Sequence, residues 1–208
     1  MNRRYEQAIE VLKSIQETAR VSFVTRLGDS PGKMLAMAYA LAGHHEEARM
    51  AVEDFRRMLP FASIAHFRSL YDHHKRPEDL EFRLDALRRA GFPRWPFGYQ
   101  GSTKHRANES ELKALTMGRT WTGWDVSANA AFVKEFATDG SVMYASKTTL
   151  MSGTAELQGD VLCEQFTLSM LGRPRCGYVY RTQDGTATDG NEFTYVNSYT
   201  IFKFSIKK

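Results

Sequence analysis

Residues 39–48, "YALAGHHEEA", place a glycine and two histidines between two stretches whose apolar residues recur every three or four positions. That spacing is typical of amphipathic helices. Gly43 supplies the backbone freedom that a tight turn needs. Glu46 and Glu47 suit the first turn of the following helix, because its dipole favours negative charge there. The stretch therefore predicts a helix, a turn and a second helix, with the small Ala48 where the two helices cross.

The same helical spacing continues on both sides of this turn, up to residue 91. Gly91 and Pro93 then end the pattern, as is usual just beyond a helix C-terminus. We expect five helices in this half. Their apolar stripes consist of Ala8, Val11, Leu12 and Ile15; Leu35, Ala38, Tyr39 and Ala42; Val52, Phe55 and Leu59; Ile64, Phe67 and Leu70; and Leu80, Leu84 and Leu87.

From Arg119 onward the apolar period changes to two, which indicates β-strands. Turn dipeptides, such as Asp139-Gly140 and Gly159-Asp160, lie where tight hairpins are expected. We therefore expect an α+β protein in which helical hairpins precede an antiparallel meander, closed or nearly closed into a barrel to hide its edges. The candidate strands are residues 119–124, 130–137, 141–150, 153–159, 160–169, 175–182, 192–197 and 199–207.

This change of period divides the chain into a helical domain over residues 1–92 and a β domain over residues 109–208. Residues 93–108 between them are rich in proline, glycine and polar residues and are expected to be a linker. Its apolar side chains are too numerous for a free tether, so we expect them to pack on one domain: Trp95, Phe97 and Tyr99. A short helix over residues 109–117, capped by Asn108 or Ser110, should lead into the first strand.

The composition, 42% hydrophobic and 25% charged, is that of an ordinary globular protein, without an apolar run of the roughly 20 residues that span a bilayer. The first residues lack a signal-peptide core, so we expect a cytoplasmic protein that does not bind membranes. The net charge is +2 for residues 1–92, +3 for 93–108 and −1 for 109–208. Because this excess is thinly spread, we expect no nucleic-acid binding.

The helical half resembles a tetratricopeptide repeat. The resemblance is carried by Tyr39 on the first helix, Gly43 in the turn, Ala48 at the helix crossing and Pro60 twelve residues later. An earlier partial copy, "RRYEQAIEVLKSI", begins at residue 3, and its Ala8 precedes Ala48 by 40 residues, against about 34 in the family. The resemblance implies a structural role for these residues and a protein partner bound in the groove between packed helices.

Residues 1–93, which end in "LRRAGFP", also look like the repeat tail found downstream of the catalytic domain in many bacterial adenylate/guanylate cyclases. No segment of this chain resembles the catalytic domain itself. The resemblance therefore implies a regulatory tail, or a relative of that tail, without cyclase activity.

The β half is similar to small uncharacterised bacterial β-domains of lipocalin-like type. The shared pattern includes "GRT" at residue 118, "DG" at residue 139 and "GDVLC" at residue 159. This chain departs from the pattern at Ala155, where a tryptophan is expected; the change either leaves a cavity or alters the core packing. The resemblance implies a small-molecule site, for which the candidate residues are Arg119, Trp121, Trp124, Tyr178 and Arg181, with Arg175 as a further cation.

Trp121 and Trp124 are three residues apart on one candidate strand, so they should point to opposite faces, one in the core and the other at the rim. The two cysteines, Cys163 and Cys176, fit no zinc-binding pattern. In a cytosolic chain they are expected to be a structural pair of reduced thiols; a disulfide and a redox or metal role are the alternatives.

Signatures of common enzymes are missing from the sequence, including GxSxG, the P-loop, GxGxxG in a strand context, HExxH and the calcium-binding loop. Adjacent acids such as Glu46 and Glu47 fit a solvated helix face better than a catalytic pair. The adjacent histidines, His44 with His45 and His73 with His74, would need further ligands from elsewhere to hold zinc. We therefore expect neither a metal nor a cofactor.

We consider three functions; we expect the first, a non-enzymatic one, and keep the other two as alternatives. The first is a non-catalytic regulatory or interaction module, with the β domain sensing a ligand or bracing the helices. The second is a calycin-like small-molecule binder whose helices form a dimerisation arm, which a sizeable cavity inside the strands would favour. The third, an enzyme, would need titratable residues gathered from distant segments.

Overall fold

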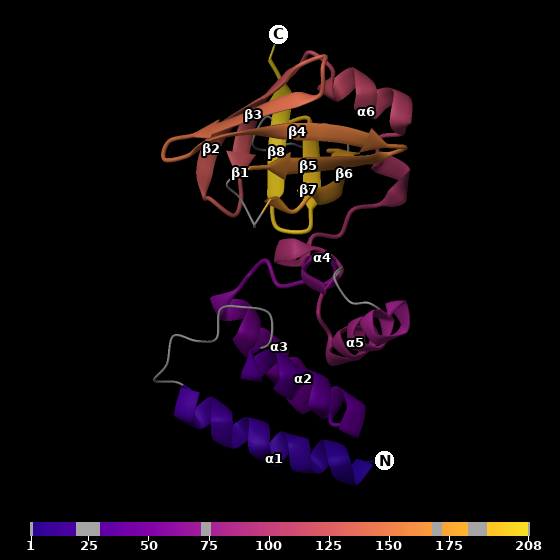
Figure 1. Ribbon diagram of the computed structural model, residues 1–208, viewed down its shortest axis with the longest axis vertical. Helices are drawn as coiled ribbons and strands as arrows, with labels where there is room; N and C mark the ends of the chain where they lie inside the picture. Colours follow the sequence, from indigo (N-terminus) through magenta and orange to yellow (C-terminus); the bar gives the residue numbers. More distant parts are fainter. Residues whose placement is uncertain (1, 20–29, 72–75, 168–171, 183–190, 208) are drawn as a thin grey trace. The chain divides into compact units, whose positions relative to one another are not determined.

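The protein is described by a computed structural model that covers residues 2–19, 30–71, 76–167, 172–182 and 191–207. The chain divides into two units, Met1–Gly98 and Tyr99–Lys208. The first is helical and the second is a closed antiparallel barrel (Figure 1), so the expected α+β class and order of the two halves are confirmed.

The described residues of the helical unit form the five expected helices. Helix α2 lies at its centre and packs against α1, α3 and α5. Its buried residues include Ala36, Ala38 and Ala40, whose small side chains allow neighbouring helices to approach closely. The bounds are Asn2–Ala19 for α1, Pro31–Ala42 for α2, His45–Met58 for α3, Ile64–Tyr71 for α4 and Pro77–Ala90 for α5.

The α2–α3 turn has the predicted form. Gly43 ends α2 with φ of 92°, a left-handed conformation that favours glycine. Glu46 and Glu47 lie in the first turn of α3, and Ala48 is completely buried. The helix–turn–helix prediction is therefore confirmed, whereas the assignment of this hairpin to the tetratricopeptide family remains a prediction.

Two members of the expected apolar stripe on α1 lie outside the core. Ile9 is the buried residue of this helix, at 2% exposed, whereas Val11 and Ile15 are 59% and 44% exposed. Helix α2 is the main neighbour of α1. The apolar stripe of α1 is wider than the surface that one packed helix covers, so α2 buries only one side of the stripe. The sequence pattern included Val11 and Ile15 in this stripe but did not show which of its residues α2 covers.

In the described part of the β unit, helix α6 (Glu109–Thr116) is followed by eight strands, in which each strand pairs with the next and β1 pairs with β8. Asn108 caps α6 in a reciprocal capping box with Glu111, which confirms the first of the two expected caps. The strand bounds are Thr120–Asp125, Ala130–Phe136, Ser141–Ser146, Leu150–Gln158, Val161–Phe166, Arg175–Arg181, Phe193–Asn197 and Ile201–Ile206 for β1 to β8.

The turn between the third and fourth predicted strands lies earlier than expected. Residues 141–150 read as a single strand, but β3 ends at Ser146 and β4 begins at Leu150. The backbone N–H of Ser146 donates to the carbonyl of Thr149 across the turn, at 2.8 Å. Lys147, Thr148 and Thr149 carry no strong turn signal, which is why the sequence pattern placed the turn too late, between residues 150 and 153.

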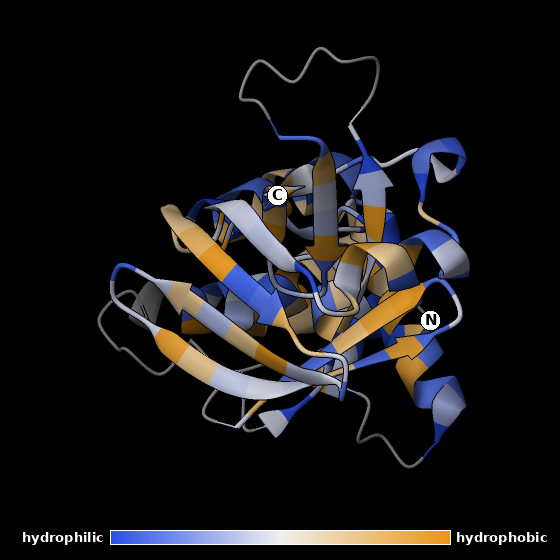
Figure 2. Ribbon diagram, turned by 90° about the horizontal axis from the view of Figure 1, so that it is seen from above, coloured by the Kyte–Doolittle hydropathy of each residue, from blue (hydrophilic) through white to orange (hydrophobic). Residues whose placement is uncertain are grey.

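Alternate strand residues point into the barrel and fill it, while the intervening residues face outward. Gly123 of β1 permits a close approach between strands, since an added Cβ would lie 1.9 Å from the carbonyl oxygen of Lys203 on β8. Hydrophobic segments of both helices and strands are seen in Figure 2. None of the described helices is long and apolar enough to cross a membrane.

Parts of the segment expected to be a linker are packed. Backbone N–H groups at the start of α4 donate to the carbonyls of Pro93 and Arg94, and Trp95 is buried. The division into units falls after Gly98, at the end of the short 3₁₀ segment η2 (Pro96–Gly98). A second such segment, η3 (Thr103–His105), belongs to the β unit. Its neighbour Ala107 bonds to β6 through the carbonyl of Val179, at 2.8 Å.

Candidate functional site

The barrel interior is filled mainly by aromatic and aliphatic side chains. At its centre Trp121 stacks on Phe204 with ring centroids 3.8 Å apart, and Tyr195 stacks on Phe202 at 5.9 Å. This packing contributes both buried apolar area and favourable ring contacts. The buried hydrophobic set of the β unit includes Ala107, Leu112, Trp121, Phe132, Phe136, Val142, Tyr144, Leu162, Phe166, Val179, Tyr195, Phe202 and Phe204.

A lysine and a glutamate lie within this apolar filling. Lys134 of β2 is 0% exposed and Glu164 of β5 is 1% exposed, and Nζ of the lysine lies 2.7 Å from Oε1 and 3.0 Å from Oε2 of the carboxylate. Charged side chains are almost never fully buried without such a partner. This pair is the most unusual chemical feature of the described residues, and it defines our candidate site.

Aromatic rings surround the ammonium group of this pair. Nζ of Lys134 lies 3.8 Å from the ring centroid of Phe202, and 5.3 and 5.5 Å from those of Tyr195 and Trp121. Burial lowers the pKa of Lys134 and is the largest effect on it, while the charge of Glu164 opposes that shift. The rings and the carboxylate together replace the water that an exposed ammonium would bind.

A second buried carboxylate lies at one end of the barrel. Asp125, the last residue of β1, accepts hydrogen bonds through Oδ1 from the hydroxyls of Ser127 and Thr200, both at 2.8 Å. Its Oδ2 accepts the hydroxyl of Tyr144 at 3.0 Å. Burial and the neighbouring charge of Asp125 raise the pKa of Tyr144 to about 12. This carboxylate therefore ties the β1–β2 and β7–β8 turns to strand β3.

Arg175, the first residue of β6, extends the group of charges. It lies directly opposite Glu164 in the β5–β6 register, and its guanidinium is 4.7 Å from the ring centroid of Tyr199. Burial lowers the pKa of Arg175, whereas Glu164 and Asp125 counteract that shift. Two cations and two anions thus share the barrel interior, so the site carries no net charge when all four are ionised.

This arrangement limits the chemistry that the site can perform. The ammonium group of Lys134 is fully buried and bonded to Glu164, so it is not exposed as a nucleophile or base. Asp125 is likewise occupied by several donors. Within the described parts of the chain, no three His, Cys, Asp or Glu side chains form a group that could hold a metal ion. The cluster therefore has the geometry of a structural polar core.

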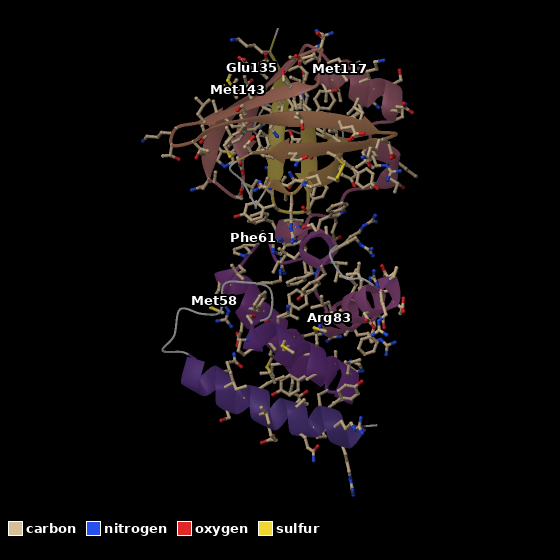
Figure 3. All side chains as sticks on the ribbon, in the orientation of Figure 1. Met58, Phe61, Arg83, Met117, Glu135 and Met143 are labelled. Carbon is tan, nitrogen blue, oxygen red and sulfur yellow. A yellow bond between two sulfur atoms is a disulfide. The ribbon has the colours of Figure 1, made fainter. Side chains whose placement is uncertain are left out.

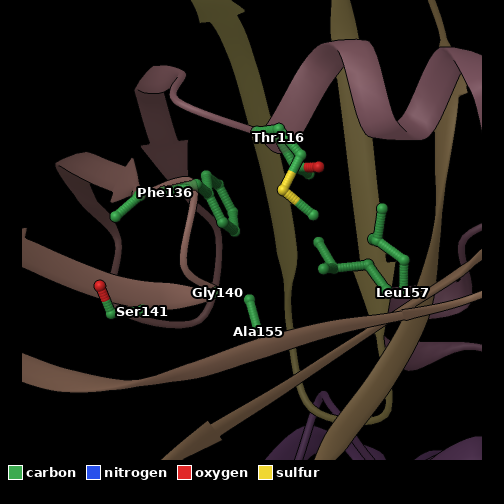
Figure 4. A pocket seen from close by; sticks show the side chains of 9 residues that line it. Thr116, Phe136, Gly140, Ser141, Ala155 and Leu157 are labelled. Carbon is green, nitrogen blue, oxygen red and sulfur yellow. The ribbon is translucent and has the colours of Figure 1, made fainter.

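A pocket lies at the other end of the barrel, beneath α6 (Figure 4). Its cavity volume is about 10 Å³, which is about the room that a single water molecule needs. Ala155, where the resemblance led us to expect tryptophan, lines this pocket. The other lining residues are Thr116, Met117, Phe136, Ala137, Gly140, Ser141, Leu157 and Leu162. A lipocalin-like ligand would need far more space, so this pocket is not a ready ligand site.

The five proposed ligand-binding residues lie on different faces of the β unit. Trp121 is buried inside and its indole N–H donates to the carbonyl of Leu115 at 2.7 Å, whereas Trp124 is 42% exposed on the outside. The prediction that these tryptophans point to opposite faces is confirmed. The remaining three candidates are bonded elsewhere: Arg119 to the carbonyl of Ala114, Arg181 to Glu111, and the ring of Tyr178 to the guanidinium of Arg106.

The two cysteines form a disulfide. Cys163 and Cys176 are directly opposite each other in the β5–β6 register and are joined through their sulfur atoms (Figure 3). The expectation of reduced thiols was wrong. The hairpin places the two residues side by side on the outer face, a juxtaposition that the sequence separation of 13 residues alone could not establish.

The histidines of the α2–α3 turn belong to no group of potential metal ligands among the residues that the structure describes. His44 precedes α3 and its Nε2 lies 2.8 Å from Oε1 of Glu6 on α1, in an exposed pair. His45 is the first residue of α3. The second histidine pair, His73 and His74, lies outside the described residues.

The helical unit contains a buried cation of its own. Lys33 is 1% exposed, and its ammonium bonds to the hydroxyl of Tyr71. The same nitrogen lies 5.3 Å from the ring centroid of Phe67 and 4.8 Å from that of Tyr71. This contact joins the start of α2 to α4 inside the unit.

The sequence analysis missed the Lys134–Glu164 pair, although its signal was present. Lys134 alternates with Phe132 and Phe136, and Glu164 lies between Leu162 and Phe166. Period-two alternation places each charge on the inward face with its aromatic neighbours. Two such exceptions of opposite sign in one small barrel could have suggested an internal ion pair.

Protein-family models, curated proteins and solved structures were all compared with this chain, and none of them matches it.

Proposed function

We propose that this chain is a non-catalytic regulatory or interaction protein whose helical unit binds a protein partner. The proposal follows the resemblance to tetratricopeptide repeats and to the tail of bacterial adenylate/guanylate cyclases. On this proposal the α2–α3 hairpin and the two residues that follow it form the scaffold, through Tyr39, Gly43, Ala48 and Pro60. The partner contacts the helices that pack on this scaffold.

The observation that carries this proposal is the open side of helix α1. Val11 and Ile15 are one helical turn apart, so they lie on the same side of α1, and they are 59% and 44% exposed. Burying a large aliphatic side chain contributes roughly 1.5–3 kcal/mol. An amphipathic helix of a partner that covers both residues would thereby gain the apolar contact that α2 leaves unmade.

The barrel then serves as a rigid companion of the helical unit. Its interior is occupied by aromatic side chains and by a paired lysine and glutamate, which favours a stable folded body over a ligand container. A calycin-like binder would have to displace this packing, including the stacked pair Trp121 and Phe204. For this reason the interaction module is preferred over the small-molecule binder.

The test is quantitative affinity purification from source cells with the 208-residue chain as bait. A Val11→Asp/Ile15→Asp variant should lose a specific partner by at least about tenfold, since a buried charge opposes an apolar contact. Phe82→Asp is the matched control, because Phe82 is 57% exposed on α5 of the same unit. A set of bound proteins that is identical for all three baits would overturn the proposal.

A further inference from the structure

The outer face of strands β1 to β4 carries four large apolar side chains, one from each strand. Their exposed fractions are 42% for Trp124, 38% for Val133, 40% for Met143 and 71% for Leu150. Scattered apolar residues are normal on a protein surface, but a group on adjoining strands indicates an interaction surface. We call these four residues the outer patch.

The strand register gives the outer patch a central row. Thr122 lies opposite Val133, Val133 lies opposite Ala145, and Ala145 lies opposite Leu150. Residues opposite one another across neighbouring strands have their Cβ atoms about 5 Å apart. The row therefore crosses four strands without a charged side chain.

Same-face positions on either side of this row hold the other two members of the patch. On β1, Trp124 is two residues after Thr122, the member of the row on that strand, and Ala131 on β2 lies opposite it. On β3, Met143 is two residues before Ala145, the member of the row on that strand, and it lies opposite Glu135 on β2. Met143 and Glu135 are both labelled in Figure 3. Such positions are about 7 Å from the central row, because one strand residue advances about 3.4 Å.

Opposite charges border the patch on its two sides. Glu135 is exposed on the same side as Met143, and no ion pair joins it to another described residue. Lys147 is exposed directly after the end of β3, two residues beyond Ala145 and therefore on the far side of the row from Met143. The order across the patch is thus acidic, apolar, basic.

We propose that the outer patch binds the outer patch of a second copy of this chain. A two-fold axis that runs across the strands along the central row brings each apolar row onto its counterpart. The same rotation reverses the strand direction, so that Glu135 of each copy comes beside Lys147 of the other. This is an isologous contact, in which one surface complements itself.

The charge order selects a second copy over other occupants. An anionic membrane would attract Lys147 and repel Glu135, and a uniformly charged partner would meet one matching and one opposing charge. A partner surface whose charges run in the order basic, apolar, acidic would place an opposite charge beside both Glu135 and Lys147. The outer patch of a second copy, rotated by the two-fold axis, presents its charges in that order. Since β1 pairs with β8, the closed barrel offers a strand face for association in place of a free strand edge.

The first test measures the mass of the full chain in solution by light scattering over a range of concentrations. The wild type should form a dimer at concentrations up to about 100 μM, and Leu150→Asp should raise the dimer dissociation constant about tenfold or more. Phe82→Asp, on the helical unit, is the control and should leave the dimer intact. A monomeric wild type, or a dimer weakened equally by both changes, would overturn the proposal.

The second test reverses the charges. Glu135→Lys and Lys147→Glu should each weaken the dimer, because each places like charges side by side across the axis. The double variant should restore the dissociation constant to within about threefold of the wild type, since the pair is then re-formed with exchanged signs. A double variant no better than either single variant would exclude the two-fold arrangement. Circular dichroism and thermal unfolding check that every variant remains folded.

Discussion

Lys134 and Glu164 form an ion pair in the centre of the barrel, with Nζ 2.7 Å from Oε1 and both side chains shielded from solvent. They come from strands β2 and β5, which are not neighbours in the sheet. The pair therefore spans the interior and links opposite parts of the wall. Removing two charges from water is costly, and such pairs are retained where mutual attraction and local contacts offset that cost.

Replacing one partner should destabilise the barrel strongly. We expect Lys134→Met to reduce the free energy of unfolding by about 3–5 kcal/mol, because Glu164 would keep a buried charge without this cation. The double variant Lys134→Met/Glu164→Gln should be less destabilised than the sum of the two single changes. Urea unfolding of all four proteins measures the coupling, and strictly additive losses would contradict an energetic pair.

The tyrosine beside Asp125 should make stability depend on pH in alkaline solution. The pKa of Tyr144 is raised to about 12, against 10.0 for an ordinary tyrosine, so the folded state keeps a proton that the unfolded state loses. The contribution of Tyr144 to the free energy of unfolding is therefore fully present below pH 10 and is lost as the pH rises towards 12. Tyr144→Phe should flatten this decline in denaturant midpoints. Since burial also raises the pKa of Tyr99 to about 12, a smaller decline should persist in the variant.

Strand β1 should not tolerate a side chain at Gly123. An alanine Cβ there would lie 1.9 Å from the carbonyl oxygen of Lys203, so the strands would have to separate. We expect Gly123→Ala to cost at least about 3 kcal/mol or to prevent folding of the barrel. Gly32→Ala provides the control, because its Cβ would contact Phe55 at an ordinary 3.5 Å. Thermal unfolding of both variants distinguishes local crowding from a general sensitivity to glycine replacement.

Helix α3 should be equally intolerant of a larger residue at Ala48, which is 0% exposed. Ala48→Leu should lower the stability of the helical unit by about 1–3 kcal/mol through overpacking. Glu47→Leu, one residue earlier and exposed, should have little effect. Chemical unfolding followed by circular dichroism provides the measurement; equal effects of the two changes would place Ala48 outside the packed interface.

The histidines of the turn should be dispensable. His44→Ala/His45→Ala removes the exposed contact with Glu6 and should change stability by less than about 1 kcal/mol. Metal content, measured by elemental analysis of the purified protein, should not differ from the wild type. Stoichiometric zinc that disappears in the variant would reverse our interpretation of this turn.

Local sequence patterns were sufficient to predict most of the architecture. Alternation of inward and outward residues located the eight strands, and the capping residue Asn108 located α6, because both signals depend on near neighbours in the chain. The width of the apolar stripe on α1 did not reveal which part of it α2 covers. That depends on helix packing, which left Val11 and Ile15 exposed.

The candidate site was harder to predict because its members are distant in sequence. Lys134 and Glu164 are 30 positions apart, and the alternation that places each charge on an inward face does not show which charge it meets there. The proposed ligand residues failed to converge for the opposite reason: their residue types suggested binding, but strand direction sends Trp121 inward and Trp124 outward. Pairing across strands decides such sites, and a single sequence does not state the register.

The disulfide between Cys163 and Cys176 bears on how the barrel would come apart. Strands β5 and β6 share the shortest ladder in the described barrel, in which the cysteines are flanked by the pairs Leu162 with Gly177 and Glu164 with Arg175. The disulfide links β5 and β6 covalently where the register pairs the fewest residues of the described strands. Reduction would leave this ladder as the natural place for local opening, exposing the polar core to water before the remaining strands separate.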